Sequence, residues 1–174
     1  MIRPIRQNYR ENTRLFNKIK CQFICILGGN VVIEHVGSTA IPKMSGKNII
    51  DILIGVPTIS EIKKVAQKID KAGYFRGRHN PSGEYIFFAS RNTETGSGDT
   101  HIHLTAQNTE RYDDFLALKK YLLDRPSVAK KYSDLKRNIT KTAGNDRQKY
   151  KLLKNDYIDE LLKSARKYYE KVSK

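Results

Sequence analysis

Apolar positions predict a helix followed by two strands in the first third of the chain. The helix spans residues 8–28, where Gly28-Gly29-Asn30 ends it. Its apolar residues recur at helical spacing, at Leu15, Ile19, Phe23 and Ile26. The β-branched run 31–36 predicts a short strand. The longer apolar run 48–56 predicts a strand covered on both faces of a sheet.

The next segment alternates between helix and strand signals. Thr58-Ile59-Ser60-Glu61 has the pattern of a capping box, which predicts a helix to about Ala72 that ends at Gly73. Its sheet-facing residues are then Val65 and Ile69. A short edge strand at 74–78 and two strands at 84–90 and 100–106 follow, with a turn at 80–83 and a polar loop at 91–99.

From residue 109 onward the pattern is helical throughout. One helix carries Phe115, Leu118 and Leu122, Pro126 opens a second at its first turn, and Gly144-Asn145 separates the second from a third. The apolar positions of the last two helices are Val128, Tyr132, Leu135, Ile139, Tyr150, Leu153, Tyr157, Leu161 and Ala165. The fold class predicted is α+β, with a small mixed sheet flanked by helices in residues 1–107. Residues 108–174 form a helical appendage packed on this core as one compact unit.

The net charge and the two cysteines limit the classes of partner and the cellular compartment that we expect. The 174 residues carry a formal net charge of +15, which favours phosphate-bearing partners, although a solvated basic surface is the more ordinary explanation. No RNA-recognition or zinc-finger motif supports dedicated nucleic-acid binding, and no run approaches the ~18 apolar residues of a membrane span. The amino end lacks a secretory signal, so we expect a cytoplasmic protein whose Cys21 and Cys25 are reduced and buried.

Candidate chemistry centres on Gly37-Ser38 and Asp51. A Gly-Ser turn after a strand offers backbone N–H groups and a hydroxyl to a phosphate. Asp51 interrupts an apolar strand, where a carboxylate needs a partner such as a metal ion. Together they suggest a site for a nucleotide and Mg²⁺; the alternative is a structural acid paired with a nearby Lys, His or turn N–H.

Longer segments resemble the GrpB family of nucleotidyltransferase-like proteins. The similar segments are Glu34-His35-Val36-Gly37-Ser38-Thr39-Ala40-Ile41-Pro42, Lys47-Asn48-Ile49-Ile50-Asp51-Ile52, His101-Ile102-His103-Leu104 and several helical stretches up to about residue 165. The resemblance implies the nucleotidyltransferase fold of the DNA polymerase β type. It also implies a candidate protein partner, because in some bacteria this domain is fused to dephospho-coenzyme A kinase, whose folding it is thought to assist. This chain has no P-loop of its own.

The chain departs from an active nucleotidyltransferase in its acids. The position two residues after Asp51, where a second acid is usual, is Leu53. The strand expected to carry a third acid offers His101 and His103 instead. A two-Mg²⁺ site needs several carboxylates, and Glu84 and Asp99 are the candidates from elsewhere in the chain.

These residues define the predicted site. Asp51 and His103 are the catalytic candidates, and phosphate-binding candidates are Gly37, Ser38, Thr39 and Lys47. Metal-ligand candidates are Asp51, His35, His101 and His103, with Mg²⁺ or Mn²⁺ favoured over a transition metal such as Zn²⁺. His101 and His103 share one face of their strand, whereas Glu34 and His35 point to opposite faces. Hydrogen-bonded histidines that hold the sheet to the helices are the structural alternative.

The function predicted is binding of a nucleotide or other phosphate-bearing ligand, with nucleotidyl transfer to a small acceptor as its extension. A non-catalytic binding or folding-assistance module and a His-based metal-binding protein stay open as alternatives. Further cations able to meet an anion are Lys43, Arg76, Arg78, Arg91, Lys119, Lys136 and Lys154.

Overall fold

The structure is a computed structural model that describes residues 5–77, 83–90, 98–144 and 146–172. In chain order the elements are β1 (Ile5–Arg6), α1 (Tyr9–Leu27), β2 (Val32–Val36), the short 3₁₀ helix η1 (Ser38–Ala40), β3 (Ser45–Gly46), β4 (Ile50–Val56), α2 (Ile59–Lys71), β5 (Phe75–Arg76), β6 (Tyr85–Ala89), β7 (Thr100–Ala106), α3 (Glu110–Asp124), α4 (Pro126–Ala143) and α5 (Arg147–Val172).

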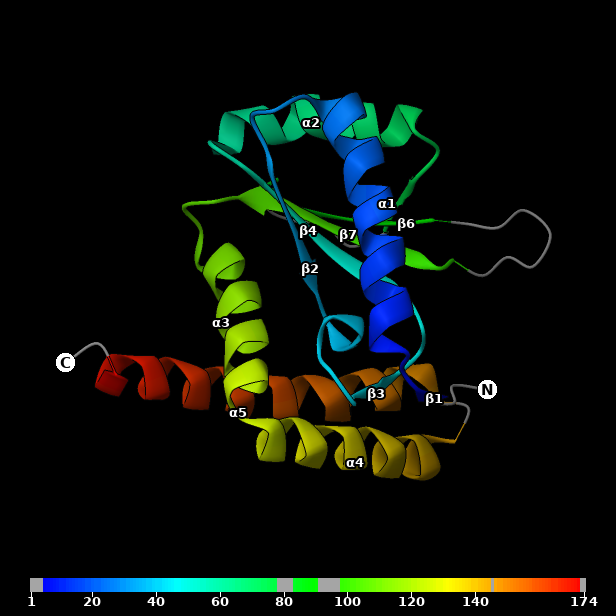
Figure 1. Ribbon diagram of the computed structural model, residues 1–174, viewed down its shortest axis with the longest axis vertical. Helices are drawn as coiled ribbons and strands as arrows, with labels where there is room; N and C mark the ends of the chain where they lie inside the picture. Colours follow the sequence, from blue (N-terminus) through cyan, green and yellow to red (C-terminus); the bar gives the residue numbers. More distant parts are fainter. Residues whose placement is uncertain (1–4, 78–82, 91–97, 145, 173–174) are drawn as a thin grey trace.

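A mixed five-stranded sheet organises the molecule. Its strand order is β2-β4-β7-β6-β5, with β4 and β7 parallel and every other pair antiparallel. β1 and β3 form a separate two-stranded antiparallel ribbon. The predicted α+β class with a mixed sheet is therefore confirmed (Figure 1).

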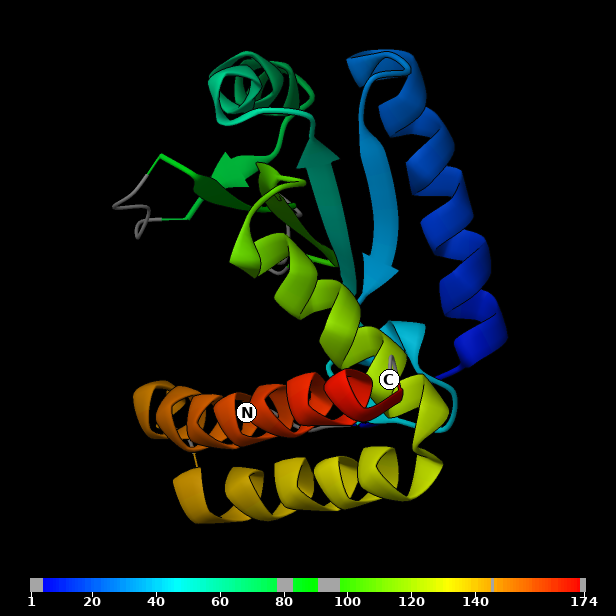
Figure 2. The same cartoon turned by 90° about the vertical axis from the view of Figure 1, so that its left-hand side faces the viewer.

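One face of the sheet carries the main hydrophobic core. Alternate residues of β4 (Ile50, Ile52, Ile54 and Val56) are buried there against α1 and α2. Figure 2 shows α1 running beside β2 and β4 on this side. Val65 and Ile69 of α2 belong to the same core, as predicted.

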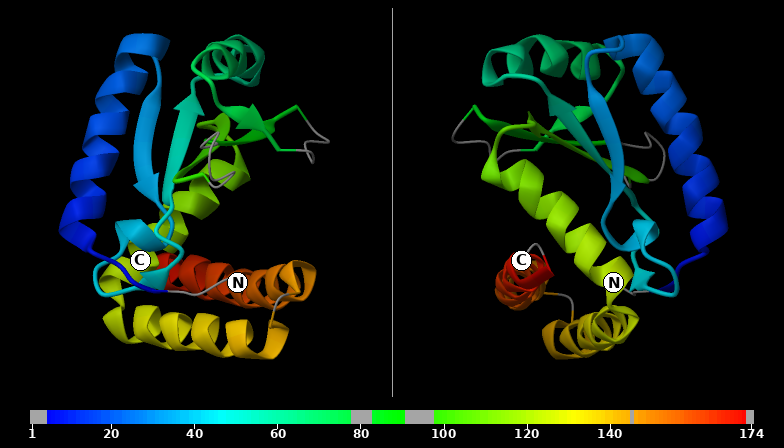
Figure 3. Two further views of the ribbon diagram at one scale, coloured as in Figure 1. Left: turned by 90° about the vertical axis from the view of Figure 1, so that its right-hand side faces the viewer. Right: turned by 60° about the vertical axis from the view of Figure 1, so that its left-hand side comes forward.

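The other face of the sheet is covered by α3. Tyr112 forms a buried cluster with Val36 and Leu53, and Phe115 and Leu116 pack against that cluster. α4 and α5 pack together beyond one end of the sheet, with α5 passing under α3 (Figure 3). The hydroxyl of Ser133 in α4 accepts a hydrogen bond from the Ser45 backbone N–H, which ties this helix to β3.

The buried face of α1 differs from the prediction. Phe16, Ile19, Phe23 and Leu27 are buried, whereas Leu15 and Ile26 are 38% and 40% exposed. The helix is rotated so that the neighbouring apolar residues at 16 and 27 meet the sheet.

The prediction of buried cysteines is also wrong. Cys21 and Cys25 are free and exposed. Each follows a core residue, Ile19 or Phe23, by two positions, which turns it about 200° around the helix axis.

The helix starts predicted from local sequence signals are confirmed in part. Thr58 precedes α2 as predicted, but its hydroxyl bonds the Glu61 carboxylate and the Ser60 hydroxyl rather than a backbone N–H. Pro126 lies in the first turn of α4, as predicted. Most of the predicted turn at 80–83 and loop at 91–99 lies outside the described residues. Among the helices described, none combines the length and apolar character required to cross a membrane.

Candidate functional site

Asp51 is the charged residue of β4, an interior strand of the sheet. Its strand partners are Val36 on β2 and His101 on β7, so its carboxylate lies on the α3 face of the sheet. His101 Nδ1 lies 3.1 Å from Asp51 Oδ1, and His103 Nε2 lies 3.8 Å from the same oxygen. The parallel pairing of β4 with β7 therefore brings Asp51 together with two histidines that lie about 50 positions later in the chain.

The Asp51 carboxylate is held in its ionised form. Burial acts to raise its pKa, but the hydrogen bonds and positive charge that His101 and His103 provide outweigh burial and keep the pKa well below its usual range. An ionised carboxylate next to two imidazoles can bind a cation or orient a proton carrier.

The His103 ring is fixed from its other nitrogen. The Tyr85 hydroxyl lies 2.8 Å from Nδ1, and the Phe115 ring centroid lies 4.5 Å from that of the imidazole. Burial raises the pKa of Tyr85 to about 12, so its hydroxyl keeps its proton. A donating Tyr85 hydroxyl leaves the imidazole proton on Nε2, the atom that faces Asp51. Tyr85 is not among the site residues predicted from the sequence, although its spacing from Phe87 places both on one face of their strand.

Gly37 lets the turn approach Asp51 closely. Gly37 has φ +71°, and a Cβ built there would lie 2.2 Å from Asp51 Oδ2. Ser38 begins η1, and Gly46 of β3 packs on its hydroxyl so closely that a Cβ there would lie 2.2 Å from Ser38 Oγ. Glycine is required at position 37, whereas a side chain at position 46 would displace the Ser38 hydroxyl. The structure thus brings the predicted phosphate-binding turn and the predicted acid together.

Thr39 is buried, and its hydroxyl is already engaged. Its Oγ1 donates to the Ile49 carbonyl oxygen at 3.3 Å and accepts from His35 Nε2 at 3.0 Å. Of the predicted phosphate-binding residues, Thr39 therefore serves to join β2 to the segment before β4.

His35 lies on the opposite face of the sheet from Asp51. Its ring stacks on Phe16 of α1 with a centroid separation of 4.6 Å. Burial and the charge of Lys119 lower its pKa to about 4, so it is neutral in the fold. Glu34 points the other way and pairs with Lys119 of α3 at 2.9 Å, as the strand alternation predicted. The structure does not bring His35 to the other metal-ligand candidates.

No second carboxylate joins Asp51 in the part of the chain that the structure describes. Leu53 is fully buried against Tyr112. Asp99 accepts hydrogen bonds from Ser90 and Thr100, and Glu84 is exposed. Within the described residues, no group of three or more His, Cys, Asp or Glu side chains is arranged to hold a metal ion.

Comparison with known proteins agrees with these features. The model of the GrpB protein family matches residues 3–164. The chain belongs to the GrpB family. The match begins near the amino end, well before the segments on which the resemblance rested.

Two further comparisons support GrpB membership and its fold. The chain is 31% identical to the glutamate-rich protein GrpB of Alkalihalophilus pseudofirmus, over 86% of this chain and 87% of that one. A crystal structure of GrpB from Enterococcus faecalis matches with a TM-score of 0.81 at 23% identity, covering 97% of this chain and 99% of that one. The first relative is named for glutamate, but this GrpB chain is basic, with 33 Lys and Arg residues against 18 Asp and Glu residues.

A looser structural likeness is to Cid1. Cid1, whose structure is described with RNA terminal uridylyl transferase activity, matches with a TM-score of 0.47 at 11% identity. The match covers 78% of this chain but only 43% of Cid1. At this similarity the likeness carries no argument about the GrpB chain.

The predicted cations are spread over the molecule. Lys47 is exposed, with its ammonium 5.2 Å from the Tyr150 ring centroid, and Lys43 is exposed at φ +62°. Arg76 pairs with Asp70, and Arg78 and Arg91 lie outside the described residues. Lys136 differs from these because it is buried.

Proposed function

We propose that this GrpB-family chain binds a nucleotide or another phosphate-bearing small molecule on the α3 face of its sheet. In this proposal the Gly37-Ser38 turn meets the phosphates, and Asp51 holds a single Mg²⁺ or Mn²⁺ ion. The observation that carries it is the contact between turn and acid: Asp51 Oδ2 occupies the space that a Cβ on Gly37 would fill. A ligand phosphate at the turn would therefore lie close to any cation on Asp51.

The residues present fit one divalent ion better than two. Asp51 provides an ionised carboxylate, but Leu53 replaces the usual second acid, and the contacts of Asp51 are imidazoles. When bound, the ion would neutralise phosphate charge. Two-metal nucleotidyl transfer needs more carboxylates than this, so ligand binding is favoured over group transfer.

His103 is the residue that would extend binding to catalysis. Its Nε2 faces Asp51, while Tyr85 and Phe115 fix the ring. To accept a proton from a hydroxyl acceptor, the ring would have to take the other tautomer, in which Nδ1–H donates to Tyr85 and the Nε2 lone pair is free. A His-based transition-metal site is less well supported, because His35 lies on the other face and the described residues form no three-ligand group.

A thermal-shift screen tests the proposal. ATP, CTP, GTP, UTP and coenzyme A would each be added with and without Mg²⁺ or Mn²⁺. A ligand at about 100 times its Kd stabilises the fold by roughly 2.7 kcal/mol, enough to raise Tm measurably. The proposal expects a metal-dependent shift with at least one nucleotide. A shift with none of them would contradict it and favour a module that binds a protein partner.

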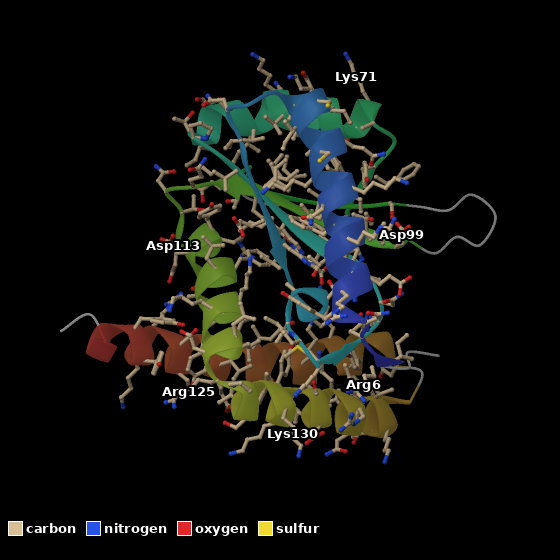
Figure 4. All side chains as sticks on the ribbon, viewed as in Figure 1. Arg6, Lys71, Asp99, Asp113, Arg125 and Lys130 are labelled. Carbon is tan, nitrogen blue, oxygen red and sulfur yellow. The ribbon has the colours of Figure 1, made fainter. Side chains whose placement is uncertain are left out.

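Matched variants make the screen specific. Asp51→Asn removes the carboxylate charge at nearly constant volume and should abolish the metal-dependent part of the shift. Asp113→Asn is the control, because Asp113 is exposed at the start of α3 (Figure 4). An equal loss in both variants would show that general charge, rather than Asp51, is responsible.

A further inference from the structure

Cys21 and Cys25 form a pair of exposed thiols on α1. Both are free, and both side chains are exposed. Cys21 lies midway between Ile19 and Phe23, which are buried, and Cys25 lies midway between Phe23 and the buried Leu27. At about 100° per residue, this spacing places both cysteines nearly opposite the buried stripe of the helix. Cysteine is among the residue types most often buried, so an exposed pair without a packing role points to the reactivity of the thiols.

The face of α1 that carries the cysteines is open to solvent. The helix lies on the outside of the molecule, with the sheet behind it (Figure 2). Gly28 and Gly29 follow the cysteines, and a Cβ built at either position would meet no atom within 4 Å. An ion in solution can therefore reach both sulfurs without a rearrangement of the chain. This face is also separate from the site around Asp51, which lies on the α3 side of the sheet.

The spacing of the two cysteines favours binding of an ion over formation of a disulfide. Residues four positions apart in a helix share one face and have Cβ atoms about 5–6 Å apart. A disulfide needs a Cβ separation of about 3.5–4.5 Å, so a bond between Cys21 and Cys25 would require local unwinding of α1. A metal ion between the sulfurs spans the gap, because two thiolate bonds of about 2.3 Å hold the sulfurs up to about 4.6 Å apart.

Two cations lie on the same face of α1 as the cysteines. Arg14 and Lys18 precede Cys21 by seven and three positions, spacings that place residues one above the other along a helix. Both are exposed, and neither takes part in the ion pairs found among the described residues. Two thiolates with one monovalent cation carry a single negative charge, which the charges of Arg14 and Lys18 offset.

We propose that Cys21 and Cys25 form a binding site for one Cu(I) ion per chain, independent of the proposed function. Thiolates are soft ligands that select Cu(I), Zn²⁺ and iron–sulfur clusters. Structural Zn²⁺ and iron–sulfur clusters take four protein ligands, whereas Cu(I) is stable with two thiolates. Within the described residues, no group of three or more His, Cys, Asp or Glu side chains is arranged to hold a metal ion, so the pair fits Cu(I) best. Both thiols release their protons to the solvent as the two sulfur–copper bonds form, and the copper keeps its oxidation state.

A competition titration tests the site. The reduced chain would be mixed without oxygen with Cu(I) held by the coloured chelator bicinchoninate, and the loss of colour measures transfer of copper to the protein. The proposal expects transfer of one Cu(I) per chain, with no change in the mass of the protein in solution beyond the bound ion. No transfer would overturn the proposal. Transfer of one Cu(I) for every two chains, with a doubled mass, would overturn the pair within one chain in favour of a site shared between two copies.

Single variants test the two ligands. Cys21→Ser and Cys25→Ser each leave one thiolate, so each should lose more affinity for Cu(I) than the roughly 10–100-fold that loss of an outer contact of a metal site costs. Both side chains are exposed, so both variants should keep the wild-type Tm. Wild-type affinity in either variant would show that the other cysteine binds copper without its partner, and would contradict the proposal.

A double variant tests the spacing. Cys25→Ser with Ile26→Cys keeps two thiols, but it separates them by five positions and about 140° around the helix axis. Ile26 is 40% exposed, so the exchange is made at the surface. This variant should bind Cu(I) as weakly as Cys25→Ser alone. Wild-type affinity in the double variant would show that any two thiols on α1 suffice, and would contradict a site defined by one helix face.

Discussion

The Asp51 carboxylate fills the space where a side chain on Gly37 would begin. A Cβ on Gly37 would lie 2.2 Å from Oδ2 and 2.8 Å from both Cβ and Cγ of Asp51. The whole acidic side chain, and not only its flexible end, packs against the turn. The two sequence features that suggested a site are therefore one structural unit, and changing the turn should displace the acid.

Gly37→Ala tests this contact. Gly37 has φ +71° and ψ −167°, a region that is essentially confined to glycine, so the variant should be destabilised by about 1–3 kcal/mol from its backbone alone, and further by the clash with Asp51. Gly28→Ala is the matched control, because Gly28 has similar backbone angles (φ +89°, ψ 175°) but no neighbour within 4 Å of its Cβ position. Urea unfolding should show a larger loss for Gly37→Ala. Equal losses of unfolding free energy in the two variants would mean that the Asp51 side chain moves aside without an energetic cost.

Leu53→Asp tests whether a second acid can be restored. Leu53 is fully buried with Val36 and Tyr112, so a carboxylate there would have to lose its water without a partner. We expect a loss of roughly 4 kcal/mol or more in the free energy of unfolding. Leu53→Ala, which only leaves a cavity, should cost about 2–5 kcal/mol at the same site. A Leu53→Asp variant as stable as the wild-type chain would contradict the cost assigned to a buried carboxylate at this position.

His35 predicts a pH dependence of stability. Its native pKa of about 4 lies below the usual 6.5, so the unfolded chain binds the proton more strongly between these values. The contribution of His35 to the free energy of unfolding is fully present above about pH 6.5. It is lost as the pH falls towards 4, and the total loss is about 3 kcal/mol. His35→Gln should remove this slope. Urea unfolding of both chains between these pH values measures the difference, and parallel curves would exclude His35 as the cause.

The sequence predicted the strands that form the site more accurately than the residues that those strands bring together. The alternation of side chains along β7 predicted that His101 and His103 lie on one face, and in the structure both approach Asp51. The face on which His35 lies depends on which residue of β2 pairs with Asp51. That partner is Val36, a consequence of register between strands that one strand's pattern cannot show.

Other differences have equally local causes. In α1, neighbouring apolar residues such as Leu15 and Phe16 allow two rotations of the helix, and only packing on the sheet selects one. The burial of Lys136 depends on how α4 docks on β3, through contacts between residues about 90 positions apart. Long-range docking of this kind leaves no periodic signal in the sequence.

Calorimetric titration of a nucleotide into the wild-type chain and Asp51→Asn, with and without Mg²⁺, tests the central claim most directly. The account predicts that Mg²⁺ tightens binding to the wild-type chain and has no effect on Asp51→Asn, with Asp113→Asn behaving as wild type. Equal tightening by Mg²⁺ in wild type and Asp51→Asn would contradict the assignment of Asp51 as the metal ligand of a phosphate-binding site.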